Sequence, residues 1–540
     1  MAFNLIHDAW IPVRRAGGGQ AMVRPAEVVA GIDLDPVVAV AAPRPDLTGA
    51  LTELLVGLLA AAATPADIDE WLDWWQAPPS LDDLETRLAA IAPAFDLDGD
   101  GPRAFQDLAR LEDAGGEPSG VERLLIDAPG DQSLRNNTDL FVRRGRVSVL
   151  SRAAAAAALV TLQTYAPGGG RGHRTSLRGG GPLTTLVVPD TGEAMPPLWR
   201  TLWANIPIGG RTGGGEALTP RVFPWLAPTR TSEKGEVTTP LDADPLQVFF
   251  GLPRRIRLLF EPAASGETCD LYGITDPVVV RGFVARPYGV NYEGGWRHPL
   301  TPHNLDKQRG PLPRHGSPGG VSYRYWLGLV QDARDEKSPR QPAACVRQWR
   351  EELSIELDDV PGMRLRAFGY DMDKKQIMKA RCWYDSTMPV LPAIDPLFRT
   401  RLDAEVAVMV TAAQEAATTT ARQIKAALAV PPDTAVIEER FWRATETAFA
   451  TRLSVLGEVV GDRERVDAVR LSWRDVLRRE AMRAFDASVD PVTVLIKHMA
   501  RVVKARTDLL RAFSGKGRIA QVLDLPLPSL KEKAGKDMVR

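Results

Sequence analysis

The chain is 540 residues long, 44% apolar and 25% charged, which excludes a wholly disordered or collagen-like protein and predicts about three or four folding units. Its 67 basic and 68 acidic residues give a formal net charge of -1, which by itself argues against a polyanionic partner. The three cysteines, Cys269, Cys345 and Cys382, are too few for a disulfide framework and favour the reducing cytoplasm.

A β-hairpin followed by apolar helices is predicted for the N-terminal part of the chain. Phe3–Ile6 is a candidate strand, and Trp10–Val13 with the turn at Gly17–Gly19 completes the hairpin pattern. Val147–Thr164 predicts a buried helix that runs into a glycine-rich segment. Apolar side chains at helical spacing predict two more core helices, with the residues Leu51, Leu54, Leu55, Leu58, Leu59, Ile68, Trp71, Leu72 and Trp75.

Short β-type runs alternate with long connections rich in proline and glycine between residues 182 and 390. The runs are Leu183–Val188, Arg255–Phe260, Val278–Val284 and Arg364–Tyr370. Together with the preceding helices they predict one irregular mixed α/β domain over residues 1–390.

The C-terminal part of the chain changes to an uninterrupted helical pattern after Pro396. Breaks near Pro431, Gly461 and Asp490 divide it into four helices of about 22–30 residues, which predicts an antiparallel four-helix bundle over residues 391–515. The expected bundle core is Leu402, Val406, Met409, Phe441, Phe449, Leu453, Val469, Trp473, Val476, Val492, Ile496, Met499 and Val503. Residues 516–540 have little periodicity and predict a loosely ordered basic tail. The fold class is therefore α+β.

Charge is unevenly distributed along this nearly neutral chain. Residues 1–134 carry 8 basic and 23 acidic side chains, whereas residues 135–181 carry 8 basic and one acidic and residues 463–518 carry 14 basic and 7 acidic. The two cationic segments are suited to follow a polyanionic backbone, or each is simply a solvated face. The preference for arginine, which makes up 54 of the 67 basic residues, favours phosphate contacts, although it can also reflect genome composition.

The glycine-rich segment Ala166–Gly181 is the sharpest local feature. Its seven glycines allow a ligand to approach the backbone closely, and interleaved arginines supply charge. It is not a phosphate loop of the Walker type, because Gly172 is followed by histidine and arginine, and no ribose-binding acid follows about 20 residues later. Neither an ATPase nor a dehydrogenase is indicated.

Other motifs give no confident catalytic or metal site. Asp96–Gly101 resembles the first half of a calcium loop, but Pro102, Arg103 and Asp107 do not fit the second half. Cys269 with His298 and His303 lacks a fourth zinc ligand. No nucleophile elbow or paired-carboxylate motif occurs, so we expect no catalytic residue, no metal and no cofactor.

Several motifs carry a resemblance to a known family. They are Phe3–Ile6, Trp10–Val13, Ala166–Gly168, Leu177–Thr185 and Trp296–Pro299. With them the chain resembles the CasA family, the large subunit of the type I-E CRISPR effector complex Cascade, over nearly its whole length. The resemblance implies a non-enzymatic cytoplasmic subunit for antiviral defence. It would recognise the protospacer-adjacent motif (PAM) in duplex DNA, open the duplex to start R-loop formation, and recruit the helicase-nuclease.

The resemblance also implies roles for individual residues. A glycine loop would approach the minor groove of the PAM, and a basic side chain on a nearby strand, Arg286 or alternatively Arg281, would contact it. A hairpin tip would wedge the duplex open. The glycine loop comprises Gly168, Gly169, Gly170, Arg171, Gly172 and His173, and the wedge tip comprises Lys374, Lys375 and Gln376.

Docking and partners follow from the same resemblance. A loop at Gln132–Arg144, with Asn136, Asn137, Phe141 and Arg143, would dock on the guide RNA 5′ end and neighbouring subunits, although Phe141 equally fits a core strand. The bundle would contact the small subunits and the displaced strand. Some members carry a zinc knuckle after the strand equivalent to Arg255–Phe260, but only Cys269 remains here, so zinc is not expected.

Two other functions remain open on the sequence alone. One is a structural scaffold whose cationic segments bind guide RNA only. The other is a free-standing nuclease or NTPase, suggested by the glycine-rich loops and scattered aspartates. No signal-peptide pattern and no apolar run of about 18 residues is present, so no membrane partner is expected.

Overall fold

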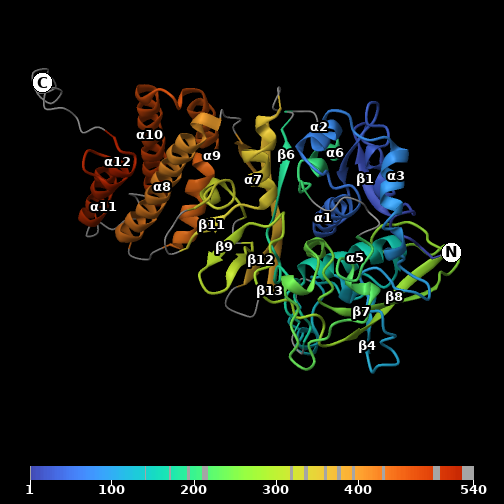
Figure 1. Cartoon of the computed structure of the whole chain (residues 1–540). Coiled ribbons are helices and arrows are strands. Elements are labelled where there is room, and N and C mark those ends of the chain that lie inside the picture. The colour runs from blue at the N-terminus through green and yellow to red at the C-terminus, as the bar shows by residue number, and fades with distance from the viewer. Residues whose placement is uncertain are drawn as a thin grey trace, which may run out of the picture. The chain divides into compact units, whose positions relative to one another are not determined.

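The chain forms two compact units in the computed structural model (Figure 1). The structure describes residues 2–139, 142–169, 172–190, 192, 195–209, 217–316, 320–333, 338–357, 362–373, 379–391, 396–428, 432–489 and 499–525. The N-terminal unit comprises Met1–Gly320, Asp332–Leu353 and Arg366–Ser386. The C-terminal unit comprises Val321–Gln331, Ser354–Leu365 and Thr387–Arg540. The predicted domain limits at residues 390 and 515 stay predictions.

Four small sheets and seven helices are described in the N-terminal part of the chain. The strands are β1 (Ile11–Arg15), β2 (Gln20–Val23), β3 (Val37–Val40), β4 (Glu117–Gly120), β5 (Leu150–Ser151), β6 (Thr184–Pro189), β7 (Arg255–Pro262), β8 (Val278–Arg286), β9 (His303–Asp306), β10 (Gly310–Pro313), β11 (Arg340–Gln341), β12 (Met363–Asp373) and β13 (Lys379–Leu391). The helices are α1 (Pro45–Ala62), α2 (Ile68–Gln76), α3 (Leu81–Ala89), α4 (Asp131–Arg135), α5 (Arg152–Tyr165), α6 (Leu198–Trp203) and α7 (Ala344–Glu351). The sheet orders are β2-β1-β3, β10-β9-β11, β13-β12-β6 and β4-β8-β5, with β7 also paired to β8.

The N-terminal hairpin is confirmed, but its strands differ from the prediction. Strands β1 and β2 pair antiparallel from Ile11 opposite Val23 to Arg14 opposite Gln20. Gly18 occupies the turn with a φ of 86°, which a residue with a side chain rarely adopts. The predicted strand Phe3–Ile6 is wrong, because this segment makes only one isolated bridge and otherwise turns toward the core.

Helices α1 and α5 pack against each other and form the central layer of the unit. Helix α1 is long and apolar enough to cross a membrane, with a mean hydropathy of 1.3, but 89% of it is buried inside the protein, as expected of a core helix. Helix α5 begins at Arg152 and not at Val147, because Leu150–Ser151 first pairs with β8 and the Ser151 hydroxyl then accepts from Ala154 N–H at 3.2 Å. The predicted core side chains of α1 are buried, as are Trp71 and Trp75 on α2, whereas Ile68 and Leu72 on α2 are only partly buried.

The sheet around β8 carries the segments that matter for the site. Strand β8 pairs antiparallel with β7 from Arg286 opposite Arg255 to Val278 opposite Pro262. The pairing shifts register between Leu259 and Phe260, which is a β-bulge. Helix α5 also contacts β8. Gln163, near the end of α5, bonds the backbone of Arg254 just before β7, so the glycine-rich segment starts close to the start of β7.

The C-terminal unit is a helical bundle of α8 (Pro396–Ala427), α9 (Thr434–Val459), α10 (Arg463–Ser488), α11 (Met499–Ala512) and α12 (Arg518–Val522), whose helices α8, α9, α10 and α11 pack together (Figure 1). Asp433 and Asp462 cap the starts of α9 and α10 with their carboxylates. The core residues predicted on α8, α9 and α10 are buried, and Trp473 donates its ring N–H to the carbonyl of Met409 at 2.9 Å. The predicted α+β class with a C-terminal bundle is confirmed.

Two details of the bundle differ from the prediction. On α11 Val503 is 57% exposed, and the inward face is formed by Val502, Ala505 and Leu509, because those three recur at helical spacing. Residues 516–540 are predicted to be a loosely ordered tail, and residues 526–540 of it lie outside the described residues. Within the tail α12 forms and packs against α8 and α11. Its apolar residues Ile519, Ala520 and Leu523 are buried, which explains its order. Residues 490–498, with the predicted core positions Val492 and Ile496, lie outside the described residues.

Candidate nucleic-acid interface

The glycine-rich segment after α5 forms a tight loop at the surface of the N-terminal unit. Gly169 donates its N–H to the carbonyl of His173 at 3.1 Å, which closes the loop on itself. A Cβ added to Gly169 would lie 2.7 Å from the Cβ of His173, so the closure requires glycine. Gly170 and Arg171, which also belong to the predicted loop, fall outside the described residues.

Arg254 holds the two arms of this loop together. Its Nη2 donates to the carbonyl of Pro167 at 2.5 Å, and its Nε donates to the carbonyl of Arg174 at 3.3 Å. Gln163 on α5 fixes the backbone of Arg254, because its side chain accepts from the Arg254 N–H at 3.0 Å and donates to the Arg254 carbonyl at 2.9 Å. Sequence reasoning missed Arg254, since nothing in its local pattern distinguishes it from other arginines.

The charge states of the loop follow from burial. Burial lowers the pKa of Arg254 to about 10, so its guanidinium remains cationic near pH 7. Burial also lowers the pKa of His173, and the positive charge of Arg254 lowers it further. His173 is therefore neutral at pH 7, and it closes the loop without adding charge to it.

The segment that follows β8 packs directly on the glycine loop. The N–H of Tyr288 donates to the carbonyl of Gly172 at 3.0 Å, and the N–H of Gly289 donates to the same carbonyl at 3.4 Å. A Cβ on Gly172, whose φ is 79°, would lie 2.7 Å from Tyr288 N, and a Cβ on Gly289 would lie 1.8 Å from the carbonyl oxygen of Pro253. Both glycines are required for this close approach of two backbones.

Ser232 links a third segment to the same place. Its hydroxyl accepts from Arg174 Nε at 3.0 Å and donates to the carbonyl of Gly289 at 2.8 Å. Its backbone N–H donates to the carbonyl of Tyr288 at 3.1 Å. The residue is buried, with 3% exposed, so these bonds are shielded from water. Three loops that are far apart in the sequence therefore form one rigid surface.

The two predicted basic residues of β8 have different surroundings. Arg286 ends the strand, just before the segment that bonds the glycine loop, and it pairs with Glu233 at 3.9 Å, a long distance for an ion pair. Arg281 lies nearer the middle of the strand and makes ion pairs with Glu261 at 2.5 Å and Glu267 at 2.6 Å. Arg286 thus lies two residues before Tyr288, which bonds the loop, whereas Arg281 is paired with two glutamates.

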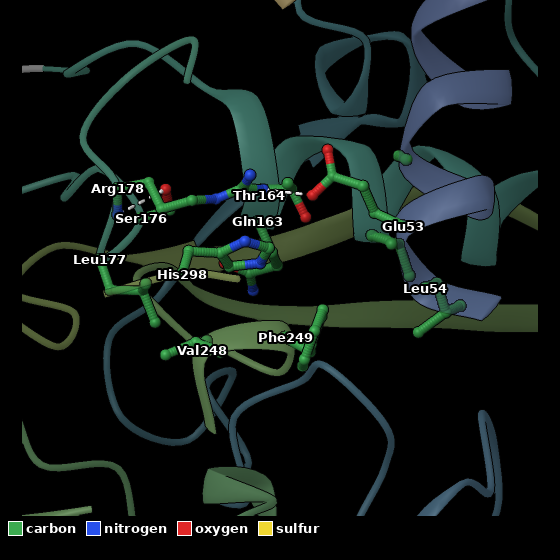
Figure 2. Close-up of a pocket in the computed structure, with 13 residues that line it drawn as sticks. Glu53, Leu54, Gln163, Thr164, Ser176, Leu177, Arg178, Val248, Phe249 and His298 are labelled. Atoms are coloured by element: carbon green, nitrogen blue, oxygen red, sulfur yellow. Dashed lines mark hydrogen bonds and ion pairs between the residues drawn. The ribbon is translucent and has the colours of Figure 1, made fainter. Parts of the chain in front are cut away.

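A buried ion pair anchors the glycine-rich segment to helix α1 (Figure 2). Arg178 donates to Glu53 on α1 at 2.5 Å, to the hydroxyl of Thr184 at 3.1 Å and to that of Thr301 at 3.0 Å. Glu53 also accepts from the hydroxyls of Thr184 and Tyr165. Figure 2 shows the carboxylate and the guanidinium pointing toward each other from two different elements. A charge buried in this way is tolerated only because each partner is satisfied.

The cavity beside this pair is too small for a nucleic-acid ligand. It measures about 20 Å³, room for about one water, and His298 and Phe249 also line it. Burial lowers the pKa of His298 well below its usual value, and the charge of Arg178 lowers it further. The histidine accepts from Leu300 N–H through Nδ1 at 3.1 Å, as a neutral ring can. The buried network therefore positions the loop and does not itself bind a ligand.

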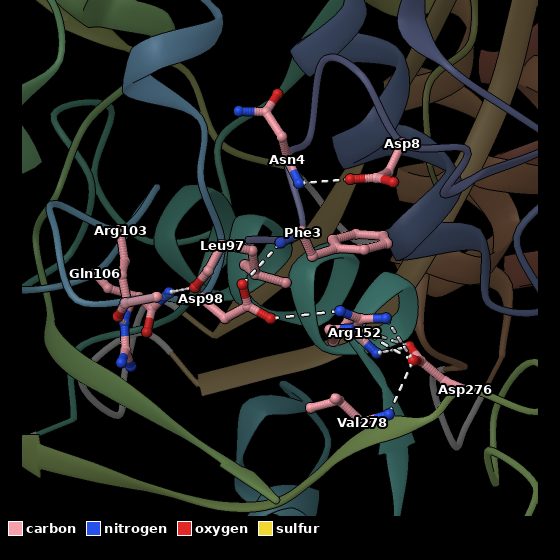
Figure 3. A network of polar contacts seen from close by, with 11 residues as sticks. Phe3, Asn4, Asp8, Leu97, Asp98, Arg103, Gln106, Arg152, Asp276 and Val278 are labelled. Atoms are coloured by element: carbon pink, nitrogen blue, oxygen red, sulfur yellow. Dashed lines mark hydrogen bonds and ion pairs between the residues drawn. The ribbon is translucent and has the colours of Figure 1, made fainter. Parts of the chain in front are cut away.

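The calcium-like acidic segment has a structural role (Figure 3). Asp98 accepts from the backbone N–H of Phe3 at 2.7 Å and pairs with Arg152 at 3.5 Å. Arg152, at the start of α5, also pairs with Asp276 at 2.8 Å. These contacts fix the N-terminus against α5 and β8. Among the described residues, no group of three or more histidine, cysteine or acidic side chains is placed to hold a metal ion.

The predicted wedge hairpin is described only up to its tip. Strands β12 and β13 are hydrogen-bonded neighbours, and Arg366 pairs with Asp385 between them at 2.5 Å. These strands are consistent with the predicted hairpin. The residues proposed at its tip, Lys374, Lys375 and Gln376, lie outside the described residues.

The predicted docking loop Gln132–Arg144 begins inside helix α4, because residues up to Arg135 are helical. Asn136 caps this helix, and Asn137 adopts a positive φ of 50°. Arg144 closes the loop by donating to Asn137 at 3.0 Å and to Asp139 at 2.6 and 2.7 Å. Phe141 lies outside the described residues, so its two predicted roles stay open.

Arg143 lines a large cavity beside the docking loop. The cavity measures about 570 Å³, within the usual range of ligand pockets. Its charged lining includes Arg44, Arg123, Asp127, Arg143, Arg146 and Asp270. The structure therefore places this predicted docking residue in a cavity rich in arginine.

Comparisons with known proteins identify the family. The model of the family described as CRISPR-associated protein Cse1 matches residues 4–484. A structure of Thermus thermophilus CasA (Cse1) is 21% identical, with a TM-score of 0.66, over 94% of this chain and 98% of that chain. A crystal structure of Thermobifida fusca Cse1 is 20% identical, with a TM-score of 0.66, over 97% of this chain and 98% of that chain. A chain of a structure titled "CRISPR RNA-guided surveillance complex" is 18% identical, with a TM-score of 0.64, over 94% of this chain and 99% of that chain.

The structural likenesses, all at low sequence identity, show a shared fold, and the family model covers most of the sequence. The resemblance drawn from the sequence motifs is confirmed by the family model. The chain therefore belongs to the CRISPR-associated protein Cse1 family.

Proposed function

We propose that this chain is the non-catalytic, DNA-binding large subunit of a type I-E Cascade complex in CRISPR antiviral defence. It recognises the PAM in duplex DNA through the minor groove, wedges the duplex open to start R-loop formation, and recruits the helicase-nuclease. The observation that carries the proposal is the glycine loop, which Arg254 holds together and which bonds through Gly172 to Tyr288, two residues after Arg286. Membership of the Cse1 family supports it.

The geometry suits contact with a narrow groove. A loop of glycines has no side chains to keep its backbone away from base edges, and its bonds to Tyr288 and Arg254 limit the entropy lost on binding. The minor groove distinguishes base pairs only coarsely, so backbone contacts with one basic side chain give relaxed sequence recognition. Arg286 supplies that side chain in the proposal, while Arg254 acts as a positioning residue.

The remaining roles are assigned to other parts of the chain. In the proposal, Lys374, Lys375 and Gln376 open the duplex, and the loop with Asn136, Asn137 and Arg143 docks on the guide RNA 5′ end and backbone subunits. The bundle contacts the small subunits and the displaced strand. The fold match to a chain of a CRISPR RNA-guided surveillance complex is compatible with such an assembly.

The proposal is tested on the assembled effector complex with a gel shift against duplexes with and without the PAM. Replacing Gly169 and Gly170 by aspartate places negative charge at the groove and should abolish PAM-dependent binding. Arg286→Gln should weaken it about tenfold, the order expected for one charged contact.

Arg281→Gln is the matched control, because it removes the same charge from the same strand at a residue already paired with Glu261 and Glu267. It should leave binding within about twofold of the unmodified complex. Unchanged PAM-dependent binding in the double aspartate variant would overturn the proposal.

A guide-RNA scaffold is the second candidate function, and the arginine-lined cavity at Arg143 is the observation in its favour. Cross-linking separates the two candidates. Lys375 or Arg171 cross-linked to guide RNA but never to duplex DNA would favour the scaffold, whereas cross-links to the duplex would favour PAM recognition.

A further inference from the structure

Tyr288 has an unusual backbone conformation at the centre of the candidate interface. Its φ is 64°, in the left-handed region that bulky residues rarely adopt, because the side chain then crowds its own backbone. The conformation is held from both sides. The N–H of Tyr288 donates to the carbonyl of Gly172 at 3.0 Å, and its carbonyl accepts from the N–H of Ser232 at 3.1 Å. Strain of this kind persists only where the surroundings enforce it.

The ring of Tyr288 lies on the glycine loop and remains open to solvent. A Cβ added to Gly172 would lie 2.9 Å from the Cδ1 atom of the ring, so the absence of a side chain at Gly172 makes room for the tyrosine. The residue is 39% exposed, whereas most aromatic residues of this unit are buried. The ring therefore packs on the loop with one part and presents another part to a ligand.

Three arginines are linked to this residue through the chain or through hydrogen bonds. Arg286 precedes it at the end of β8, and Arg174 donates to Ser232, which in turn bonds Tyr288. Arg254 holds the loop against which the ring packs. An aromatic face within a set of arginines is the combination that binds single-stranded nucleic acid, because bases stack on the ring while the cations attract phosphates.

We propose that Tyr288 is a base-stacking residue, which packs its ring against a base that has left the DNA duplex next to the glycine loop. This inference rests on the proposed function, because a duplex must be bound and opened there to supply the unpaired base. A stacked base replaces the stacking energy lost when its pair opens, so the ring stabilises the opened state and not the closed duplex. The strained backbone fixes the ring in position before DNA arrives.

Three substitutions separate stacking from mere support of the loop. Tyr288→Phe keeps the aromatic face. Tyr288→Leu keeps apolar bulk on Gly172 and a similar backbone strain but has no aromatic face. Tyr288→Asn removes the ring, and asparagine tolerates a positive φ better than other residues, so the backbone conformation is preserved.

The binding assay uses the assembled effector complex with a fully paired PAM duplex and with the same duplex carrying a mismatched bubble next to the PAM. The leucine and asparagine variants should bind the bubble duplex about tenfold more weakly, the order expected for losing one base–aromatic stack, whereas the phenylalanine variant binds normally. Initial binding of the paired duplex should change less than about twofold in all three. A leucine variant that behaves like the unmodified protein would show that the residue only supports the loop, and would overturn the inference.

A second readout detects stacking directly. 5-Iododeoxyuridine placed at the bases next to the PAM and irradiated should cross-link to Tyr288, and the cross-link should persist in the phenylalanine variant and be lost in the leucine variant. Cross-links that do not involve residue 288 would contradict stacking. If the Gly169 and Gly170 aspartate variant abolishes PAM-dependent binding while these readouts fail, the inference about Tyr288 falls and the proposed function stands.

Discussion

The two cationic segments of this chain have equal excess charge but different surroundings. In the bundle segment, arginines pair with carboxylates on the same or neighbouring helices, as Arg470 does with Glu405 and Arg506 with Asp486. In the N-terminal segment, Arg144, Arg152 and Arg178 also pair with carboxylates, but Arg174 bonds the neutral hydroxyl of Ser232. Net charge counted along a sequence therefore does not predict which surface keeps its positive potential, because neighbouring carboxylates cancel it locally.

A second difference concerns how deeply the ion pairs are buried. Arg178 and Glu53 are almost fully buried beneath the glycine-rich segment, whereas Arg474 and Asp475 pair at the surface of α10. A buried pair stabilises its surroundings only while both partners are present, because a lone buried charge is costly. A surface pair contributes little in either case. The glycine loop should thus depend on its buried pair, and the bundle should not depend on its surface pairs.

The largest expected effect comes from breaking the buried pair. Arg178→Met leaves Glu53 without its cationic partner and should lower the stability of the glycine-rich region by about 3–5 kcal/mol. Hydrogen exchange of the α5 amides measures this local opening. Arg474→Met is the matched control in the bundle and should change stability by less than about 1 kcal/mol. An equal loss of stability in the two variants would show that the buried pair and the surface pair contribute alike.

Acid should weaken the N-terminal unit through its buried histidines. Burial lowers the pKa of His303 to about 4 in the folded protein, against 6.5 for an exposed histidine. Below pH 6.5 the unfolded chain takes up the proton first, so stability falls as pH decreases from 6.5 to 4 and is fully retained above 6.5. His303 alone should account for a loss of about 2 kcal/mol at about pH 5.

Urea unfolding curves recorded between about pH 7.5 and 5 measure this loss, with hydrogen exchange of β9 to localise it. In His303→Gln the free energy of unfolding should fall by about 2 kcal/mol less between about pH 7.5 and 5 than in the unmodified protein. A variant whose pH dependence equals that of the unmodified protein would show that His303 is not the group responsible.

The smallest expected effect compares one arginine from each cationic segment. Arg174→Gln removes a charge whose hydrogen-bond partner is the neutral hydroxyl of Ser232, and should weaken binding of the effector complex to duplex DNA about fivefold to tenfold. Arg483→Gln removes a charge that Glu480 already neutralises at 3.1 Å, and should change binding less than about twofold. The slope of affinity against salt concentration should fall for the first variant only. The reverse ranking would place the DNA on the bundle.

The sequence alone predicted the elements whose cause is local. The hairpin turn at Gly17–Gly19, the apolar helix α1 and the core faces of α8, α9 and α10 follow from turn chemistry and helical spacing, and the structure confirms them. The strand predicted at Phe3–Ile6 is wrong because its residues turn inward to bond with distant partners such as Asp98. Local pattern gives no information on such partners.

In the candidate site too, features with a local cause could be predicted and features set by distant partners could not. The glycine-rich segment was evident from the sequence, because seven glycines among arginines are a local feature. Motifs spread along the chain indicated the family. Arg254 and Ser232 were not evident, since their roles are set by partners 87 and 58 residues away along the chain.

The amino-acid pattern alone predicts a glycine-rich cationic loop, a helical C-terminal bundle and the motifs of one family. The folded structure adds that Arg281 is paired with Glu261 and Glu267, and that Tyr288 packs on Gly172. The physical reason is that long-range hydrogen bonds and ion pairs select among chemically similar side chains. Those bonds exist only once separate segments have folded against one another.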